Sequence, residues 1–356
     1  MKKVISVFLI IMLALGQALS LVACDKDLKL NKYSEYYFDY FDTATTIIGY
    51  EETEEKFNAV CEEIKALLNE YHRLFTIYDR YENLNNLVTI NDLNDGKHTE
   101  VTVDKKIIDM LIFAKEMYAR TDGNVNVAMG SVLKIWHVYR NRGIDDPVNA
   151  ELPPMDKLQE AAKHTNIEDV IIDAEKNTVF LADPEMTLDV GAIAKGYAAE
   201  KIAQYLEEKG ITGYILNVGG NVRTIGTAED KPWNVGIENP DTENEETPYI
   251  EFLHLSGESL VTSGSYQRFY VVNGENYHHI IDPETLMPGT KYRSVSVLTD
   301  DSGMGDVMST ALFLMDYEEG AALVRSMKNL EAMWVMPDGE QRYSDGFKAY
   351  TYVPVE

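Results

Sequence analysis

TLDVGAIAKG, residues 187–196, leads into a helical pattern that ends before the β-rich segments after Gly213, and it carries an acid, Asp189, and an ammonium, Lys195. Between them, Gly191 and Ala192 have almost no side chain, so a ligand can approach the peptide groups closely. Amides at the start of a following helix can face an anion. The stretch therefore predicts a strand-to-helix turn suited to a phosphate-bearing ligand. Taken alone, it is more typical of an ordinary turn with a solvated lysine, so other segments must decide.

Apolar periodicity on both sides of this stretch predicts an α+β fold. Helical spacing predicts helices at residues 54–78, 104–120, 155–164 and 193–209, with strands at 45–50, 170–173 and 178–181. After Gly213 come short β-rich segments at 214–218, 233–237, 252–255, 269–272, 277–281 and 294–298, and then a helix at 305–315. This order favours a largely antiparallel sheet flanked by helices over repeated βαβ units. We expect one domain over residues 36–356, with room for two lobes around a cleft.

The charge of the chain excludes one class of partner. Among 356 residues, 59 are acidic and 32 are basic, which gives a formal net charge of −27. Such a chain repels nucleic acid and offers no basic groove that could follow a phosphate backbone. We therefore expect no nucleic-acid partner. The length permits a substantial core without disulfides, so function must be sought in particular sites.

The first 23 residues predict an export signal. Two lysines precede an apolar run from Val4 to Leu15, and small residues stand just before Cys24. This pattern resembles a bacterial lipoprotein signal, in which the cysteine becomes the new N-terminus and carries lipid. A plain secretory signal and an uncleaved membrane anchor are the alternatives. We expect lipidation at Cys24 and a tether over residues 24–35. The lipid would hold the protein at the outer face of the bacterial cytoplasmic membrane, or on the periplasmic side in a Gram-negative host.

Two further clusters lie in turns or short strands. The segment 122–130, DGNVNVAMG, leads into an apolar helix and is weak evidence for a ligand wall by itself. Residues 261–269 and 277–283 contain hydroxyls, one arginine and two histidines. If the second segment is a strand, His278 and His279 point to opposite faces and do not share a metal. One of them could carry a proton while its neighbour is packed or solvated.

A last cluster, GDVMSTAL at residues 305–312, combines an acid with hydroxyls. On a helix, Asp306 and Thr310 are four residues apart and share one face, with Ser309 beside them. Their oxygens suit Mg²⁺, which prefers phosphate as a co-ligand. The alternative to a metal site is that Asp306 is simply an acidic residue near the N-terminus of a helix, where the helix dipole favours a negative charge.

The order of these clusters resembles the ApbE-like flavin transferases. From about Phe41 to the C-terminal region, the resemblance is carried by LDVGAIAKGYA from Leu188, NVGGN from Asn217, TSGSY from Thr262, HIIDP from His279 and DVMSTA from Asp306. Members of that family bind FAD and Mg²⁺, cleave the FAD pyrophosphate and transfer FMN to a Ser or Thr hydroxyl of an acceptor protein, releasing AMP. The resemblance implies the same activity here, and lipoprotein members of the family fit the predicted export signal.

The resemblance also implies roles for individual residues. His279 is the best candidate for proton transfer, and FAD would contact Asp189 and Lys195, the latter as a compact cation for phosphate. The implied metal ligands are Ala192, through its carbonyl, with Asp306, Ser309 and Thr310. The rest of the cofactor pocket would be lined by Phe41, Tyr78, Ala128, Met129, Gly130 and Ile280.

Two departures from the family pattern leave other activities open. Phe41-Asp42-Thr43 stands where the family usually has Met-Gly-Thr, and Ser309 stands where some members carry another acid. A relative that hydrolyses FAD to FMN and AMP would share nearly every residue named above, with water replacing the protein hydroxyl. A surface flavin-binding lipoprotein without catalysis is a further alternative.

Overall fold

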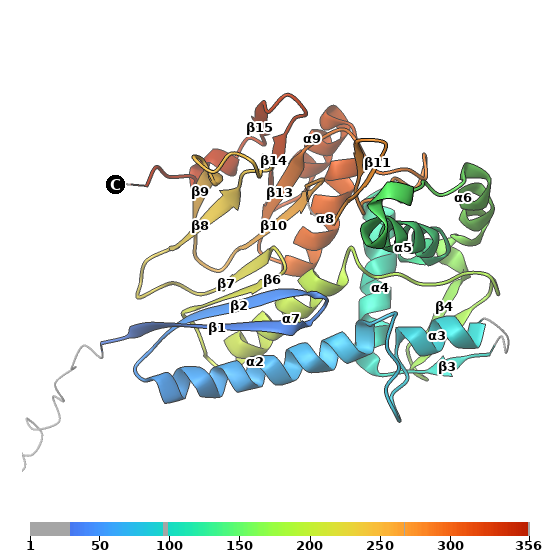
Figure 1. The fold of residues 1–356 in the computed structure, drawn as a ribbon. Helices are drawn as coiled ribbons and strands as arrows, with labels where there is room; N and C mark the ends of the chain where they lie inside the picture. Colours follow the sequence, from blue (N-terminus) through green and yellow to red (C-terminus); the bar gives the residue numbers. More distant parts are fainter. Residues whose placement is uncertain (1–28, 95–98, 267, 355–356) are drawn as a thin grey trace, which may run out of the picture.

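An eight-stranded antiparallel sheet forms the centre of the computed structural model, which describes residues 29–94, 99–266 and 268–354 (Figure 1). The order across the sheet is β1-β2-β6-β7-β10-β13-β14-β15. This confirms the predicted α+β class with a largely antiparallel sheet. The export signal and Cys24 lie outside the described residues. The eight strands are β1 (Asn31–Tyr40), β2 (Thr43–Glu51), β6 (Tyr214–Val218), β7 (Asn221–Ile225), β10 (Ser259–Gly264), β13 (Ser294–Thr299), β14 (Leu330–Val335) and β15 (Gln341–Tyr343).

The two faces of this sheet are covered differently, and β13 shows why. Its residues alternate, so Val295 and Val297 join the main core with the helices while Leu298 joins a separate core on the opposite face. That opposite face packs against the hairpin of β8 (Trp233–Glu238) and β9 (Tyr249–Leu255) and the turn Phe347–Tyr350. The helices of the main core are α2 (Glu54–Phe75), α3 (Leu87–Asn94), α4 (Lys105–Arg120), α7 (Ala194–Glu208), α8 (Ser302–Leu314) and α9 (Tyr317–Ser326).

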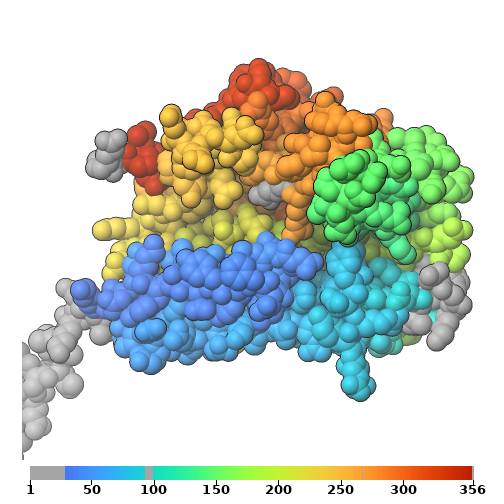
Figure 2. All heavy atoms as spheres, viewed as in Figure 1, coloured from blue at the N-terminus to red at the C-terminus, as the bar shows by residue number. Residues whose placement is uncertain are grey.

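A second group of elements lies beside the sheet and has a small core around Trp136, whose Nε1 donates to the carbonyl of Leu286 at 3.0 Å (Figure 1). The surface is hollowed between this group and the sheet (Figure 2). The group comprises α5 (Gly130–Asp145), α6 (Met155–Ala161), the hairpin β11 (Tyr270–Val272) and β12 (Glu275–Tyr277), and short 3₁₀ turns at Val127–Met129, Pro147–Asn149 and Ala162–His164. The sheet β3 (Val101–Thr102), β5 (Thr178–Leu181) and β4 (Val170–Asp173) and the turn Ile167–Asp169 bury their apolar side chains in the main core instead.

Two predicted segments differ from the structure. The strand expected at 277–281 is wrong because β12 ends at Tyr277, and the N–H of Ile280 donates to Nδ1 of His278 at 3.2 Å, which bends the chain. The tether expected to reach residue 35 ends earlier, because β1 begins at Asn31. The polar segment at the start of β1 is held by pairing with β2 and by the ring of Tyr33, which stacks on Phe57 at 5.5 Å.

The free cysteine of the described part is a core residue. Cys61 is buried on α2, and this burial raises the pKa of its thiol to about 12. A thiol so rarely ionised is a poor nucleophile. Over residues 29–94, 99–266 and 268–354, no helix combines the length and the apolar character needed to cross a membrane.

Helices α7 and α8 touch at a position that admits only glycine. A Cβ on Gly196 would lie 2.5 Å from Cβ of Asp306 and still closer to the carbonyl oxygen of Ser302. Replacing glycine by alanine inside a helix ordinarily stabilises it by about 1 kcal/mol. Here the clash reverses the sign, and we expect Gly196→Ala to lower the free energy of unfolding by about 2–3 kcal/mol, measured by denaturant titration.

Gly303→Ala is the matched control, since it lies in the same helix pair. Its Cβ would meet its nearest atom, Oδ1 of Asp301, at 3.2 Å. A smaller loss is therefore expected. Equal stability of Gly196→Ala and the unchanged protein would contradict the close helix contact.

Candidate active site

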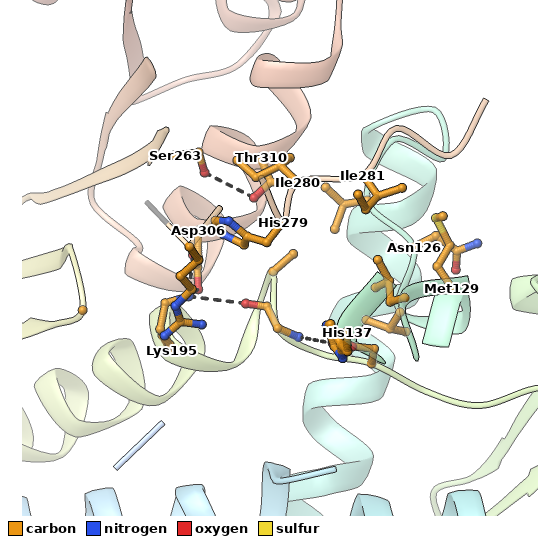
Figure 3. A pocket seen from close by; sticks show the side chains of 18 of the residues that line it. Asn126, Met129, His137, Lys195, Ser263, His279, Ile280, Ile281, Asp306 and Thr310 are labelled. Carbon is orange, nitrogen blue, oxygen red and sulfur yellow. Dashed lines mark hydrogen bonds and ion pairs between the residues drawn. The ribbon is translucent and has the colours of Figure 1, made fainter. Parts of the chain in front are cut away.

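A cavity with about 1290 Å³ of empty space, counting its open mouth, lies between the sheet and the second group of elements. Figure 3 shows Lys195 beside Asp306 at one side, with Met129, Asn126 and His137 toward the other. The lining therefore joins segments that are far apart in the sequence. It includes Thr43, Tyr78, Asn126, Met129, Leu133, His137, Arg140, Asp189, Ala192, Lys195, Asn221, Thr262, Ser263, Arg268, His279, Ile280, Ile281, Asp306 and Thr310.

The turn at 189–195 and helix α8 meet through an ion pair. Nζ of Lys195 lies 3.5 Å from both carboxylate oxygens of Asp306, and the N–H of Gly196 donates to Oδ2 of Asp306 at 2.9 Å. Burial raises the pKa of Asp306 above its ordinary value, while Lys195 and the Gly196 amide oppose that rise. The predicted juxtaposition of these two segments is confirmed, and it places an anion and a cation at one end of the cavity.

Helical geometry explains which oxygens of α8 reach the cavity. Asp306 and Thr310 are one turn apart and both line it, as their spacing predicts. Oγ1 of Thr310 lies 3.3 Å from Oγ of Ser263 on β10 (Figure 3). Ser309, expected among the metal ligands, is placed differently. Its side chain is fully buried, and its hydroxyl donates to the carbonyl of Asp306 at 3.0 Å and lies 2.9 Å from Oγ of Ser263. It supports the helix and β10 and does not line the cavity.

The two adjacent histidines have different surroundings. Both ring nitrogens of His278 are occupied, because Nε2 lies 2.7 Å from the carbonyl of Gly289 and Nδ1 accepts from the N–H of Ile280. His279 lines the cavity, and its Nδ1 is buried without a hydrogen-bond partner in the part of the chain that the structure describes. Burial, followed by the positive charge of Arg268, lowers the pKa of His279 to about 3, so the free protein keeps it neutral. Geometry therefore favours His279 over His278 as the proton carrier.

Asp189 is held at the other side of the turn. Its Oδ1 accepts from the N–H of Gly191 at 2.9 Å, and its Oδ2 lies 3.8 Å from Nε2 of His137 on α5. Nδ1 of His137 lies 3.3 Å from the hydroxyl of Tyr78. Asp189 and Tyr78 were predicted as cofactor contacts, but His137 between them was not. Its spacing from Leu133 and Arg140, four and three residues along one helix, is the signal that could have found it.

Three other predicted wall residues do not line the cavity. Phe41 and Asp42 form the two-residue turn between β1 and β2 with φ of 54° and 50°, and the ring of Phe41 packs edge-on against His72 at 5.7 Å. Ala128 is fully buried in the main core. A Cβ on Gly130 would collide with the carbonyl of Thr187, so this glycine permits close backbone packing. The expected positions of Met129 and Ile280 in the wall agree with the structure.

The oxygens around Asp306 fit a Mg²⁺ ion that is shared with a phosphate ligand. Asp306, Thr310 and Ala192 all line the cavity and would offer a carboxylate, a hydroxyl and a backbone carbonyl. In the part of the chain that the structure describes, no group of three or more His, Cys, Asp and Glu side chains could hold a metal. A single carboxylate with neutral oxygens is typical of Mg²⁺ that completes its shell with phosphate and water.

Comparison with known proteins identifies the family. The sequence model of the ApbE family matches residues 41–334. A FAD:protein FMN transferase from Klebsiella pneumoniae is 32% identical over 274 residues, covering 74% of this chain and 81% of the relative. Its counterpart from Treponema pallidum is 34% identical over 261 residues, covering 69% and 70%. The crystal structure of the ApbE protein from Thermotoga maritima superposes with a TM-score of 0.78 at 26% identity, over 91% of this chain and all of that one. The chain belongs to the ApbE family.

Proposed function

We propose that this protein is a Mg²⁺-dependent FAD:protein FMN transferase. The observation that carries the proposal is the meeting of Lys195, Asp306 and Thr310 in one cavity with His279, whose Nδ1 has no hydrogen-bond partner among the described residues. Relatives that match most of the chain bear the name FAD:protein FMN transferase, which supports the same reaction here. The reaction would attach FMN through a phosphoester to a Ser or Thr of an acceptor protein and release AMP.

The residues of the cavity suit the charge changes of that reaction. The acceptor hydroxyl forms a bond to the FMN-side phosphorus, the bond from that phosphorus to the bridging oxygen breaks, and the oxygen leaves with AMP. Lys195 would bind the pyrophosphate as a cation, and Asp306, Thr310 and the Ala192 carbonyl would hold Mg²⁺. The bound ion would neutralise charge on the phosphate oxygens. Neutral His279 would take the proton of the acceptor hydroxyl, since one of its two ring nitrogens carries no proton.

One experiment separates this activity from its two alternatives. The purified protein is incubated with FAD, Mg²⁺ and a candidate acceptor, and the products are analysed on a denaturing gel and by an AMP assay. Transfer predicts covalent flavin fluorescence on the acceptor together with AMP, and loss of both when EDTA replaces Mg²⁺. AMP without fluorescence would mean hydrolysis of FAD to FMN. Bound but intact FAD would mean a flavin-binding protein, and either result contradicts transfer.

We also propose that the mature protein is exported and anchored to the membrane by lipid on Cys24. The small residues before this cysteine and the apolar run from Val4 to Leu15 support the proposal. Metabolic labelling with palmitate should mark the protein, and the labelled protein should partition into the detergent phase. The Cys24→Ala variant should show neither the label nor the partitioning. Cys61→Ala is the matched control, because Cys61 is buried and should keep both. Membrane retention of unlabelled Cys24→Ala would point to an uncleaved anchor.

A further inference from the structure

The bridge from Tyr78 through His137 to Asp189 lies between two hollows of the molecule. All three residues line the cavity described above and also a second pocket, with about 1230 Å³ of empty space including its mouth, formed by α3, α5 and residues 184–189. A residue that borders both hollows is part of the wall between them. The wall therefore has a single imidazole at its centre, hydrogen-bonded on one side and facing a carboxylate on the other.

Tyr78 in this wall is held by few contacts. The residue follows α2, lines both hollows and is 60% exposed. Among the described residues, its hydroxyl has one hydrogen-bond contact, with Nδ1 of His137 at 3.3 Å, and its ring centroid lies 6.2 Å from the imidazole. An exposed aromatic ring with one such tether loses its fixed position when the tether is removed.

The protonation state of His137 suits this tether. Loss of solvent around the ring lowers the pKa of His137; the carboxylate of Asp189 opposes this, while Arg140 on the same helix and Arg268 from the opposite segment add to it. Partial desolvation raises the pKa of Tyr78 to about 12, so its hydroxyl keeps its proton. A neutral imidazole can accept that proton in a hydrogen bond at Nδ1 and turn an N–H at Nε2 toward Asp189. A charged imidazole could no longer accept at Nδ1.

We propose that His137 is a positioning residue that fixes the ring of Tyr78 and the carboxylate of Asp189 for binding the flavin dinucleotide. The inference rests on the proposed function, in which FAD occupies this cavity. A ring held in place before binding loses less conformational entropy when a planar ligand stacks on it. The bridge should therefore strengthen FAD binding and leave the rate of the bound complex almost unchanged.

The variants at His137 separate the two contacts. His137→Leu removes both, while His137→Asn keeps an amide oxygen near the place of Nδ1 that can still accept from Tyr78. We expect His137→Leu to raise the KM for FAD and its Kd, measured by quenching of flavin fluorescence, roughly threefold to tenfold, with kcat within about twofold. His137→Asn should recover most of the loss. Equal KM values for His137→Leu and the unchanged protein would overturn the proposal.

A double-mutant cycle gives a readout that a merely structural histidine would not produce. Tyr78→Phe retains the ring but not the hydroxyl, so it should weaken FAD binding. Adding His137→Leu to it should weaken binding by less than His137→Leu does in the unchanged protein, because only the contact with Asp189 is left to remove. If the two substitutions instead weakened FAD binding by factors that simply multiply in the double variant, the proposed hydrogen bond between Tyr78 and His137 would have no role in binding. In the unchanged protein, the KM for FAD should rise as the pH falls below the ordinary range of a histidine and His137 becomes protonated, and Tyr78→Phe should lack this rise. His164→Asn is the matched control: His164 also pairs with a carboxylate, Asp183 at 2.8 Å, but does not line the cavity.

The same measurements distinguish failure of this inference from failure of the proposed function. Absence of FAD binding and of AMP release in the unchanged protein would overturn both. Normal activity in the unchanged protein, with His137→Leu binding FAD equally well at an unchanged melting temperature, would overturn the role of His137 alone.

Discussion

Asp306→Asn is expected to lower the rate of FMN transfer by about 10²–10³-fold. The amide keeps the size of the side chain and can still accept from the N–H of Gly196, which Asp306 does at 2.9 Å. It removes the negative charge beside Lys195, and with it the one carboxylate among the proposed ligands of Mg²⁺. The rate is measured as AMP release at saturating FAD, and the affinity for Mn²⁺, used in place of Mg²⁺, is measured by titration calorimetry. Both quantities should fall.

Asp301→Asn is the control for that experiment. Asp301 caps the same helix by accepting from the N–H of Met304 at 2.9 Å, and it does not line the cavity. Losing part of this cap should cost about 1 kcal/mol of stability and leave the rate of the folded enzyme unchanged. Full transfer activity in Asp306→Asn, with normal Mn²⁺ affinity, would contradict the proposed metal site.

Replacing His279 by Gln is expected to slow transfer by about 10²–10⁴-fold with little change in FAD binding. The reason is that the ring lines the cavity and its Nδ1 has no hydrogen-bond partner among the residues described, so its loss removes a proton acceptor and breaks no hydrogen bond of Nδ1 to them. Because the pKa of His279 is lowered to about 3, the free enzyme should not lose activity through this residue between pH 5 and 8. The measurement is kcat for the flavinylated acceptor, alongside the Kd for FAD.

His278→Gln provides the contrasting result. Both nitrogens of His278 have backbone partners, the carbonyl of Gly289 and the N–H of Ile280, so this variant should lose about 1–3 kcal/mol of stability. The folded fraction should keep most of its kcat. If His278→Gln abolished transfer while His279→Gln did not, the assignment of the proton carrier would be reversed.

Much of the fold follows from local patterns in the sequence. The bounds of β4 and β5 were predicted to the residue, and the apolar spacing of α2 and α7 predicted their location within three residues. The start of β1 was not predicted, because its polar residues pair with β2 and only the ring of Tyr33 reaches the core. The strand expected over 277–281 failed because a side chain, His278, competes for the backbone N–H of Ile280.

The residues of the candidate site also fall into those that local spacing predicts and those that only the folded chain brings together. Helical spacing was sufficient for Asp306 and Thr310, since residues four apart share a face whatever surrounds them. Phe41 was misassigned because two consecutive residues with positive φ turn its ring toward His72, and such a turn is set by the hairpin as a whole. His137 was missed because its partners, Tyr78 and Asp189, are 59 and 52 residues away in the sequence. Only the folded chain brings these three side chains together.

The missing Cβ of Gly196 has a consequence for how this enzyme can change. The peptide that lets α7 approach α8 is also the one whose N–H holds Asp306, and Lys195 precedes it directly. The same few atoms are therefore constrained both by the packing of the two helices and by the contacts of the candidate site. Replacing Asp306 by Glu to change the metal preference would add a methylene at a helix contact where a Cβ on Gly196 would already clash with Asp306. Substitutions that alter the reaction are more easily accommodated at the opposite wall of the cavity, around Met129 and His137, where side chains border open space.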